Sequence, residues 1–375
     1  MDVSDVQSIQ NGLKGIYVGS ICEFIEVSLP TFFSKESRGE QNMQILKINK
    51  NDAGQRLDKF LTKAIKGLPA SLMYKYIRTK KIKVNRKRCE QKQILLEGDE
   101  IQLFIRDEFF DSPEKDDGAL ARITPKLDIV YEDENIILCN KRPGVLVHED
   151  DGARDNTLIM HIKAYLYQKG EYDPEAEQSF APALCNRIDR NTGGIVIAAK
   201  NAEALRVMNE KIKNDEIRKY YLCAVHGKPR KPTDTLTGYL KKNSADNLVT
   251  ISDKPKEGYK NIITKYKTIA TRGDSSLLEV ELVTGRTHQI RAHMSHIGHP
   301  LLGDGKYGVN RDDRVRGYKY QALYSYRLIF DFGKDEGFLG YLSGKQVALD
   351  PTEIWFVEEY SGSCEKIMKI LRDKC

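Results

Sequence analysis

The chain has 375 residues, a formal net charge of +6 and an apolar fraction of 40%. This composition is typical of a soluble globular protein, and the length suggests two domains. No apolar run of about 18 residues occurs, which argues against a membrane span, and the start lacks the pattern of a signal peptide. The seven cysteines include no Cys-x-x-Cys pair, so we expect a reducing cytoplasm without disulfides or a thiolate metal site.

Residues 1–42 differ from the rest of the chain, because they hold 3 basic and 6 acidic residues. We interpret them as an extension whose structure is in doubt. We also expect translation to start at Met43, because the codons for Arg38-Gly39-Glu40 can form a purine-rich ribosome-binding site.

Residues 43–106 carry the positive charge of the chain, with 16 Lys and Arg against 6 Asp and Glu. Such a concentration is the electrostatic footprint of a nucleic-acid-binding module. Apolar residues at helical spacing predict an amphipathic helix over 56–65, and a second helix is expected over 71–79. A run of seven basic residues without an acid then spans 78–88, and Ile82 and Val84 alternate with lysines as in a half-buried strand.

This order of elements resembles the S4 domain, a small RNA-binding fold. The matching pieces are Arg56 to Leu61, Tyr76-Ile77-Arg78, Ile82 to Asn85 and Glu97-Gly98-Asp99. A basic run is more often a solvated face than a binding site, but the absence of acids and the S4 resemblance favour RNA binding here. The residues expected to contact RNA are Lys75, Arg78, Lys80, Lys81, Lys83, Arg86, Lys87 and Arg88.

The acidic stretch 107–122 is interpreted as a flexible linker. A second domain is expected over 123–360, and a tail or helix over 361–375. Strands are predicted at 128–131, 136–140, 195–199, 220–225 and 277–284, and helices at 158–168 and 202–212. This mixture predicts an α+β domain with a large mixed, mainly antiparallel sheet flanked by helices.

Two motifs in the second domain carry the chemistry. The first, Asn186 to Gly194, places Asp189 between two arginines and ahead of two glycines and an apolar run. The second, Thr284 to His293, contains Arg286, His288, Gln289 and Arg291. A turn that feeds a buried strand can hold a reactive side chain at a fixed place on a rigid sheet. An Asp before a glycine turn is more often just a turn residue, so the first motif alone is weak evidence.

Together the motifs resemble those of the RluA-type pseudouridine synthases, and the RluC/RluD-like branch in particular. Lys219, Tyr221, Leu222 and Gly227 match the intermediate motif. The resemblance implies that the protein isomerises uridine to pseudouridine in RNA without a cofactor. It further implies large-subunit (23S) ribosomal RNA or a pre-ribosomal particle as the partner. We expect a monomer without membrane contacts.

The resemblance also assigns the site residues. Asp189 is the essential carboxylate and acts at the sugar as nucleophile or as base; Arg291 is the permanent cation beside it; and Tyr221 packs on the flipped uracil, with proton removal at C5 as a further role. Burial opposes an ionised carboxylate unless a cation pairs with it, and arginine stays charged. The expected substrate-binding residues are Arg187, which helps occupy the space of the flipped base, together with Thr192, Arg286, His288 and Gln289.

Two positions depart from the family pattern. Asn186 stands where the family has histidine, which puts a role of that imidazole in doubt. Gly193 replaces the common serine, and we expect this exchange to matter little.

Two other function classes are weighed against the enzyme. A noncatalytic RNA-binding factor for ribosome assembly would need the basic module but not the convergence of Asp189, Tyr221 and Arg291. A metal hydrolase would use His288, His293, His296 and His299, but no His-Glu-x-x-His pattern is present. We therefore expect no metal, and expect His288 to shape the floor of the active site.

Overall fold

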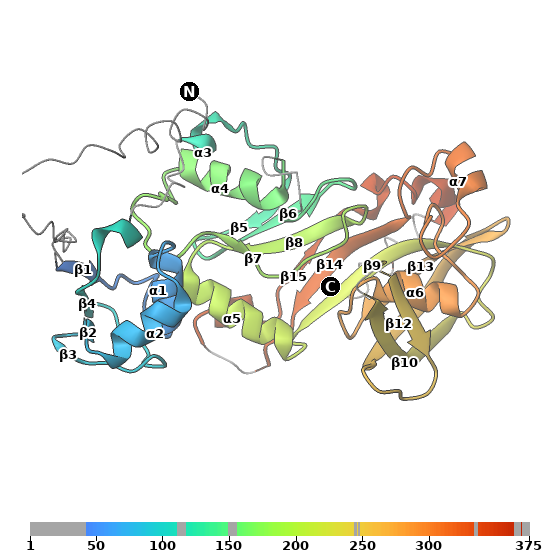
Figure 1. Ribbon diagram of the computed structural model, residues 1–375. Coiled ribbons are helices and arrows are strands. Elements are labelled where there is room, and N and C mark those ends of the chain that lie inside the picture. The colour runs from blue at the N-terminus through green and yellow to red at the C-terminus, as the bar shows by residue number, and fades with distance from the viewer. Residues whose placement is uncertain are drawn as a thin grey trace, which may run out of the picture. The chain divides into compact units, whose positions relative to one another are not determined.

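The structure is a computed structural model that describes residues 43–110, 118–148, 156–243, 246, 248–333, 337–363 and 369 (Figure 1). The predicted extension of residues 1–42 lies outside the described residues, which begin at Met43, the suggested start of translation. Most of the predicted tail over 361–375 also lies outside them.

The basic module folds as two helices against a four-stranded sheet. Its elements are β1 (Gln44–Lys47), α1 (Leu57–Ala64), α2 (Ala70–Arg78), β2 (Ile82–Val84), β3 (Lys87–Arg88) and β4 (Glu100–Leu103), and the strand order is β1-β4-β2-β3. Leu57, Phe60 and Leu61 of α1 are fully buried and pack with Ile82 and Ile101 of the sheet. The helical spacing of apolar residues therefore identified the face of α1 that forms the core.

The predicted linker contains a short helix at each end. These are η2 (Asp107–Phe109) and α3 (Ala119–Arg122), while residues 111–117 are not described. Phe109 and Phe110 pack against the core of the basic module.

The second domain is built on one large sheet. Its strands are β5 (Ile129–Glu132), β6 (Ile136–Lys141), β7 (Ala183–Leu184), β8 (Gly193–Ala199), β9 (Ile217–His226), β10 (Thr233–Asn243), β11 (Leu248–Ser252), β12 (Lys260–Arg272), β13 (Ser275–Leu282), β14 (Leu323–Phe330) and β15 (Gln346–Ala348). The order is β11-β10-β12-β13-β9-β14-β8-β6-β5, with β15 beside β14 and β7 beside β8. The β14–β8 pair is parallel, and the other described pairs are antiparallel. The predicted mixed, mainly antiparallel sheet is thus confirmed.

Helices cover both faces of this sheet. They are α4 (Leu158–Gln168), α5 (Ala202–Lys213), α6 (Gln289–His296) and α7 (Arg311–Val315), followed by the short helices η3 (Gly340–Leu342), η4 (Pro351–Glu353) and η5 (Glu358–Ser363). Helices α4 and α6 pack on the face that carries Tyr221, whereas α5 packs on the opposite face through Met208. Figure 1 shows α4 and α5 on opposite sides of β6 and β8.

Alternation along β9 places neighbouring tyrosines on opposite faces. Tyr221 belongs to the core cluster that contains α4 and α6, and Tyr220 belongs to a separate cluster with Tyr318 and Phe356. Tyr220 and Tyr221 therefore lie on opposite faces of the sheet, as the period of two in a strand requires.

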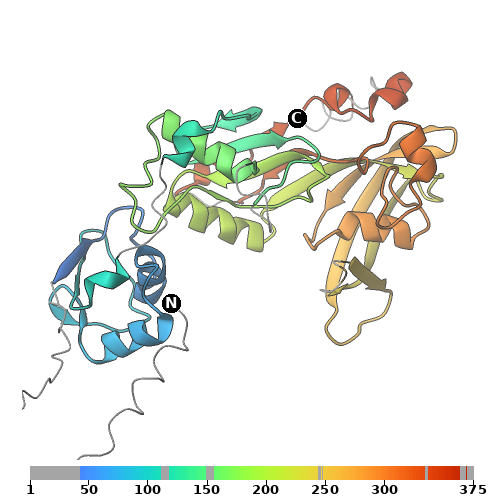
Figure 2. The same ribbon diagram turned by 45° about the horizontal axis from the view of Figure 1, so that its top comes forward.

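Helix α6 packs against β10, β11 and β12, because Ala292 shares a small core cluster with Leu240, Val249 and Ile262. Figures 1 and 2 show β10 and β12 extending beyond the neighbouring strands. None of the helices in the described part of the chain has both the length and the apolar character that crossing a bilayer requires.

Candidate active site

A cavity of about 280 Å³ gathers the two motifs at one end of the core. Its wall comes from the segment before β8, from β9, and from the loop that leads into α6. All eight predicted catalytic and substrate-binding residues line it: Arg187, Asp189, Thr192, Tyr221, Arg286, His288, Gln289 and Arg291. Because these residues come from three separate segments, the fold itself assembles the site.

Two glycines let the loop that carries Asp189 lie directly against β14. A β-carbon on Gly194 would lie 2.1 Å from the carbonyl oxygen of Ser325, and one on Gly193 would lie 2.2 Å from the ring of Tyr324. Contacts this short do not occur, so position 194 requires glycine while β14 keeps its place, and position 193 requires it while the Tyr324 ring keeps its place. The expectation that glycine matters little at position 193 is therefore wrong for this chain, because the Tyr324 ring fills the space of a side chain.

Asn186 fixes the start of the same loop. Its side-chain oxygen accepts a hydrogen bond of 2.7 Å from the backbone N–H of Ile197 on β8. The asparagine thus anchors the segment to the sheet, a function that needs an acceptor and not a titratable ring.

Asp189, Arg291 and Asp304 form the charged centre of the site. Arg291 donates from Nη1 to Oδ2 of Asp189 at 2.9 Å, and from Nε and Nη2 to the two oxygens of Asp304 at 2.8 and 2.9 Å. The side chain of Asp304 is fully buried, that of Arg291 is 8% exposed, and that of Asp189 is 27% exposed. The two-pronged contact with Asp304 fixes the guanidinium plane, so that its third nitrogen points at Asp189.

Burial and pairing compete at Arg291. Burial alone lowers the pKa of a guanidinium, but the hydrogen bonds and charge of Asp304 and Asp189 raise the pKa of Arg291 above its ordinary value. At Asp304, burial favours the neutral acid, yet the bonds from Arg291 and from the backbone of Lys306 and Tyr307 keep the pKa below the usual range. The centre therefore holds a permanent cation between two carboxylates.

Lys141 is a buried residue that belongs to neither sequence motif. Its ammonium donates to the backbone oxygens of Arg142, Val145 and Arg190 at 3.2, 2.9 and 2.9 Å. Burial lowers its pKa to about 7, and the charge of Asp189 acts in the opposite direction. Lys141 thereby ties the turn after β6 to the loop that carries Asp189.

Tyr221 lies in the wall of the cavity and is 6% exposed. Burial raises the pKa of its phenol to about 12. The side chain is therefore neutral at physiological pH and offers a flat aromatic surface to whatever occupies the cavity.

The other predicted residues fall into two groups. Thr192 and Gln289 are each 2% exposed, and their polar atoms bond within the protein, to Gln321 and to Thr264 among others. They shape the wall. Arg187 and Arg286 are exposed at its rim, where their charges face solvent.

His288 lines the cavity and has a left-handed backbone conformation, with a φ of 53°. Its Nε2 lies 3.7 Å from Oδ2 of Asp189, and burial lowers its pKa to about 4. The remaining histidines of the proposed metal cluster are engaged elsewhere: His293 with Thr264, His296 with Asp253, and His299 with the backbone of His226. Within the described residues, no group of three or more potential metal ligands is found.

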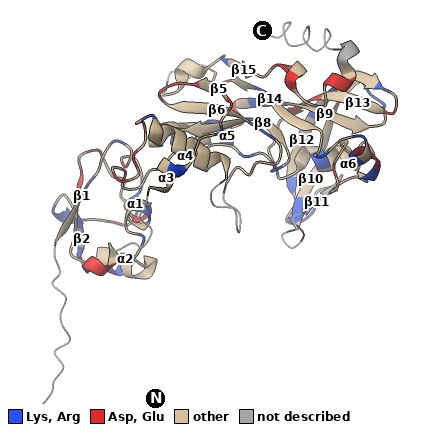
Figure 3. Cartoon of the chain, turned by 90° about the horizontal axis from the view of Figure 1, so that it is seen from above, with Lys and Arg blue, Asp and Glu red and all other residues tan. Residues whose placement is uncertain are grey.

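The predicted RNA contacts of the basic module lie at its surface. Lys75, Arg78, Lys80, Arg86, Lys87 and Arg88 are exposed, while Lys81 and Lys83 are half-buried, with their ammonium groups over the rings of Tyr76 and Phe104. Figure 3 shows a further basic stretch along β10 of the second domain, to which Lys241 and Lys242 belong.

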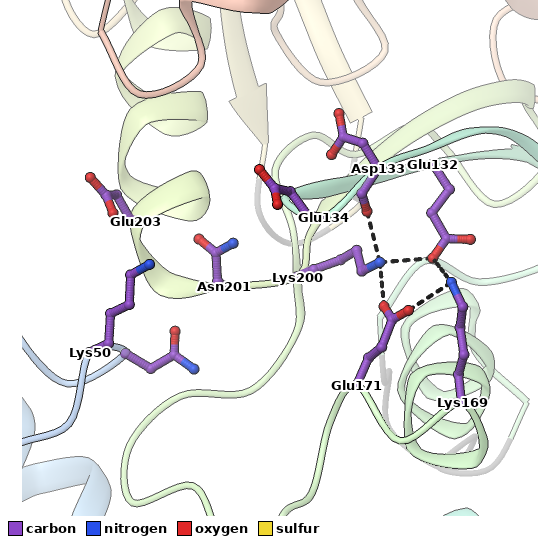
Figure 4. Close-up of a pocket in the computed structure, with 10 residues that line it drawn as sticks. Lys50, Glu132, Asp133, Glu134, Lys169, Glu171, Lys200, Asn201 and Glu203 are labelled. Carbon is purple, nitrogen blue, oxygen red and sulfur yellow. Dashed lines mark hydrogen bonds and ion pairs between the residues drawn. The ribbon is translucent and has the colours of Figure 1, made fainter.

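A larger hollow of about 700 Å³ contains none of the predicted site residues. Its wall holds an ion-pair network in which Lys169 and Lys200 each contact Glu132 and Glu171 (Figure 4). Because these charges neutralise one another, we interpret the network as structural and place the chemistry in the smaller cavity.

Both parts of the chain match known protein families. A family model for RNA pseudouridylate synthase matches residues 135–296, and one for the S4 domain matches residues 55–101. An uncharacterized RNA pseudouridine synthase of Mycoplasma capricolum subsp. capricolum is 34% identical over 81% of this chain and 96% of its own length. The ribosomal large subunit pseudouridine synthase C of Escherichia coli strain K12 is 32% identical over 73% of this chain and 82% of its own.

Among solved structures, the human RNA pseudouridylate synthase domain containing 4 is 18% identical, with a TM-score of 0.48. The match covers 67% of this chain and 94% of that one.

Proposed function

Because this chain belongs to the RluA family of RNA pseudouridine synthases, we propose that it modifies large-subunit ribosomal RNA and that Asp189 is its essential carboxylate. The observation that carries the second part is the contact between Asp189 and Arg291 in a cavity walled by Tyr221. The ribosomal substrate is inferred from the name of the Escherichia coli relative, of which the chain covers 82%.

Pseudouridine formation conserves the atoms of the nucleotide. The N1–C1′ bond breaks, the uracil turns, a C5–C1′ bond forms, the C5 proton leaves and N1 takes up a proton. No electrons are exchanged with a second reactant, so the reaction needs no oxidant or reductant.

The two oxygens of Asp189 are distinguished by their surroundings. Arg291 bonds Oδ2, and Nε2 of His288 is nearest to the same atom. Among the described residues, Oδ1 has no hydrogen-bond partner. The Asp189 side chain is 27% exposed, so it is accessible from the cavity. Oδ1 is therefore the oxygen available to the sugar of the target nucleotide, whether it attacks C1′ or removes a proton.

Arg291 keeps the carboxylate ionised when a base covers the site. Closure of a nucleobase over Asp189 removes water, which disfavours a lone carboxylate. A guanidinium that is already bonded compensates for this loss, and it needs no reorganisation during the reaction.

Tyr221 acts as a packing surface in this proposal. Its phenol remains protonated, because burial raises the pKa to about 12, so a phenolate base at C5 is disfavoured. The aromatic ring supports the uracil while the base turns.

A uridine within RNA must leave its stack before Asp189 can reach its sugar. The position of Arg187 at the exposed rim of the cavity supports a role in occupying the space that the base leaves. The basic module would hold the RNA through phosphate contacts, so binding should weaken as salt increases.

The test is release of tritium from large-subunit ribosomal RNA labelled at C5 of uridine and transcribed without modifications. We expect the wild-type protein to release tritium and to form pseudouridine at defined positions. Asp189→Asn should abolish release, yet bind the RNA with a nearly unchanged Kd.

Asp312→Asn is the matched control, because it makes the same exchange at an exposed aspartate. Full activity of Asp189→Asn would overturn the role of the carboxylate. RNA binding by the wild type without any tritium release would instead support a noncatalytic assembly factor.

A further inference from the structure

Tyr307 links the active site to the hairpin of β10 and β11. The backbone N–H of Val249 on β11 donates to the Tyr307 hydroxyl at 3.0 Å, and Nδ1 of His288 lies 2.8 Å from the same oxygen. The Tyr307 ring also lies 5.2 Å from the guanidinium carbon of Arg291. One phenol thus contacts two residues that surround Asp189.

The direction of the His288–Tyr307 hydrogen bond follows from the protons available. The hydroxyl oxygen already accepts from Val249, and its single proton needs an acceptor. Among the described residues, Nδ1 of His288 is the acceptor within reach of that proton. If Nδ1 carried the imidazole proton instead, the half-buried hydroxyl proton would have no protein partner, which is unfavourable.

A hydroxyl that donates to Nδ1 places the imidazole proton on Nε2. This nitrogen is 3.7 Å from Oδ2 of Asp189, so a shift of about 1 Å would bring it to hydrogen-bonding distance. Burial is the largest influence on the ring and lowers its pKa to about 4. The charges of Arg291 and Lys306 act in the same direction, whereas those of Asp189 and Asp304 favour the imidazolium. The ring is therefore a neutral donor at physiological pH.

We propose that Tyr307 is a positioning residue that fixes the Nε2–H tautomer of His288 and thereby directs a neutral hydrogen-bond donor at Oδ2 of Asp189. Together with Arg291, this donor holds Oδ2 and leaves Oδ1 for the nucleotide. Its importance for catalysis rests on the proposed function of Asp189.

The backbone of His288 supports this role. A φ of 53° is unusual for a residue with a side chain, and such conformations persist where the surrounding structure maintains them. Here the side-chain oxygen of Gln289 accepts from the backbone N–H of Arg286 and from the hydroxyl of Thr284. These bonds hold the turn in which His288 points into the cavity.

The tautomer can be measured without any activity assay. In protein labelled with ¹⁵N at histidine, long-range ¹H–¹⁵N spectra distinguish a protonated Nε2 from a protonated Nδ1, and a His288→Gln variant identifies the His288 signals. We expect Nε2–H in the wild type and a mixture of tautomers in Tyr307→Phe. That variant keeps the ring over Arg291 and loses only the hydroxyl.

The kinetic test is a cycle of Tyr307→Phe and His288→Gln. The amide nitrogen of glutamine can replace the Nε2 donor but makes no bond to Tyr307. We expect Tyr307→Phe to lower kcat about tenfold without changing KM, which corresponds to the loss of one hydrogen bond. In the His288→Gln background the same change should have no effect. Tyr259→Phe is the control, since it removes a tyrosine hydroxyl from the same hairpin region.

A wild-type His288 protonated at Nδ1 would overturn the proposal, and so would an equal loss of kcat in both backgrounds. An Nε2–H tautomer that depends on Tyr307, in a protein that forms no pseudouridine, would leave the positioning intact and overturn only the proposed function.

Discussion

Arg291 contacts Asp189 with a guanidinium nitrogen 2.9 Å from a carboxylate oxygen, although the two residues are 102 positions apart in the chain. The other edge of this guanidinium, formed by Nε and Nη2, donates to Asp304. The position of the cation therefore depends on a third residue that does not touch the cavity.

Removal of the charge at Asp304 should disturb both stability and catalysis. The asparagine of Asp304→Asn cannot accept hydrogen bonds from two guanidinium nitrogens as a carboxylate does. The buried Arg291 cation also loses one of its two negative partners. We expect the free energy of unfolding to fall by about 3 kcal/mol, and kcat to fall at temperatures where the variant is folded. Urea titration and tritium release measure the two effects. Asp253→Asn, at a side chain that is 80% exposed, should leave both unchanged.

Gly193 should be intolerant of serine while Tyr324 is present. The new side chain would overlap the tyrosine ring, and such overpacking costs about 1–3 kcal/mol. We expect Gly193→Ser to lower the urea midpoint and kcat. In a Tyr324→Ala background, which opens this space, the added cost of Gly193→Ser should largely vanish. Strictly additive effects of the two substitutions would contradict the contact.

Lys141→Met should affect activity more than stability. The substitution removes the energetic cost of burying an ammonium group, which offsets part of the lost stability. It also removes the donor to three backbone oxygens, so the loop that carries Asp189 is no longer held by Lys141. We expect kcat to fall at least tenfold, with RNA binding nearly unchanged, in tritium-release and binding assays. Lys126→Met at an exposed lysine is the control. An unchanged kcat in Lys141→Met would show that the loop is held without it.

The basic module should determine how binding depends on salt. If Lys87 and Arg88 contact phosphates, each alanine substitution should weaken binding of all RNA sequences alike, and reduce the slope of log K against log salt by about 1. Fluorescence anisotropy at several salt concentrations measures this slope. Lys92→Ala, outside the run of seven basic residues, should change the slope less.

Acid should destabilise the protein through its buried imidazoles. Burial lowers the pKa of His288 and of His293 to about 4, whereas the unfolded chain binds these protons near pH 6.5. Between these values the unfolded state holds more protons, so stability falls as the pH decreases from about 6.5 to about 4. The contribution of His293 is about 3 kcal/mol at the acid end. Urea midpoints measured across this range should decline less steeply for His293→Asn than for the wild type.

Local patterns predicted most of the elements near the motifs. The face of α1 was evident from apolar spacing, and the motif resemblance placed Asp189, Tyr221 and Arg291 in one site. Strands β10 and β12 were not predicted, because they contain few apolar residues among many lysines and threonines. Ile262 and Tyr266 of β12 are buried only because the strand pairs within the sheet.

Residues that act through long-range contacts could not be inferred from local patterns. Lys141 has an ordinary sequence environment, and its importance comes from a bond to Arg190, 49 positions away. Tyr324 and Gly193 are opposed only because β14 and β8 run in parallel. Asp304 and Tyr307 follow the second motif closely in the sequence, which could have drawn attention to them. Their roles depend on contacts with Arg291 and His288, which the motif does not predict.

The parallel pairing of β14 with β8 has a consequence for biosynthesis. Gly193 and Gly194 rest against Tyr324 and Ser325, and Thr192 is held by Gln321, so the turn around Asp189 lacks its support until residues 321–325 have emerged from the ribosome. Domains fold progressively as the N-terminal part of a chain is synthesised first. If Asp189 is the carboxylate we propose, the basic module can therefore fold and bind RNA while the same nascent molecule is still unable to modify it.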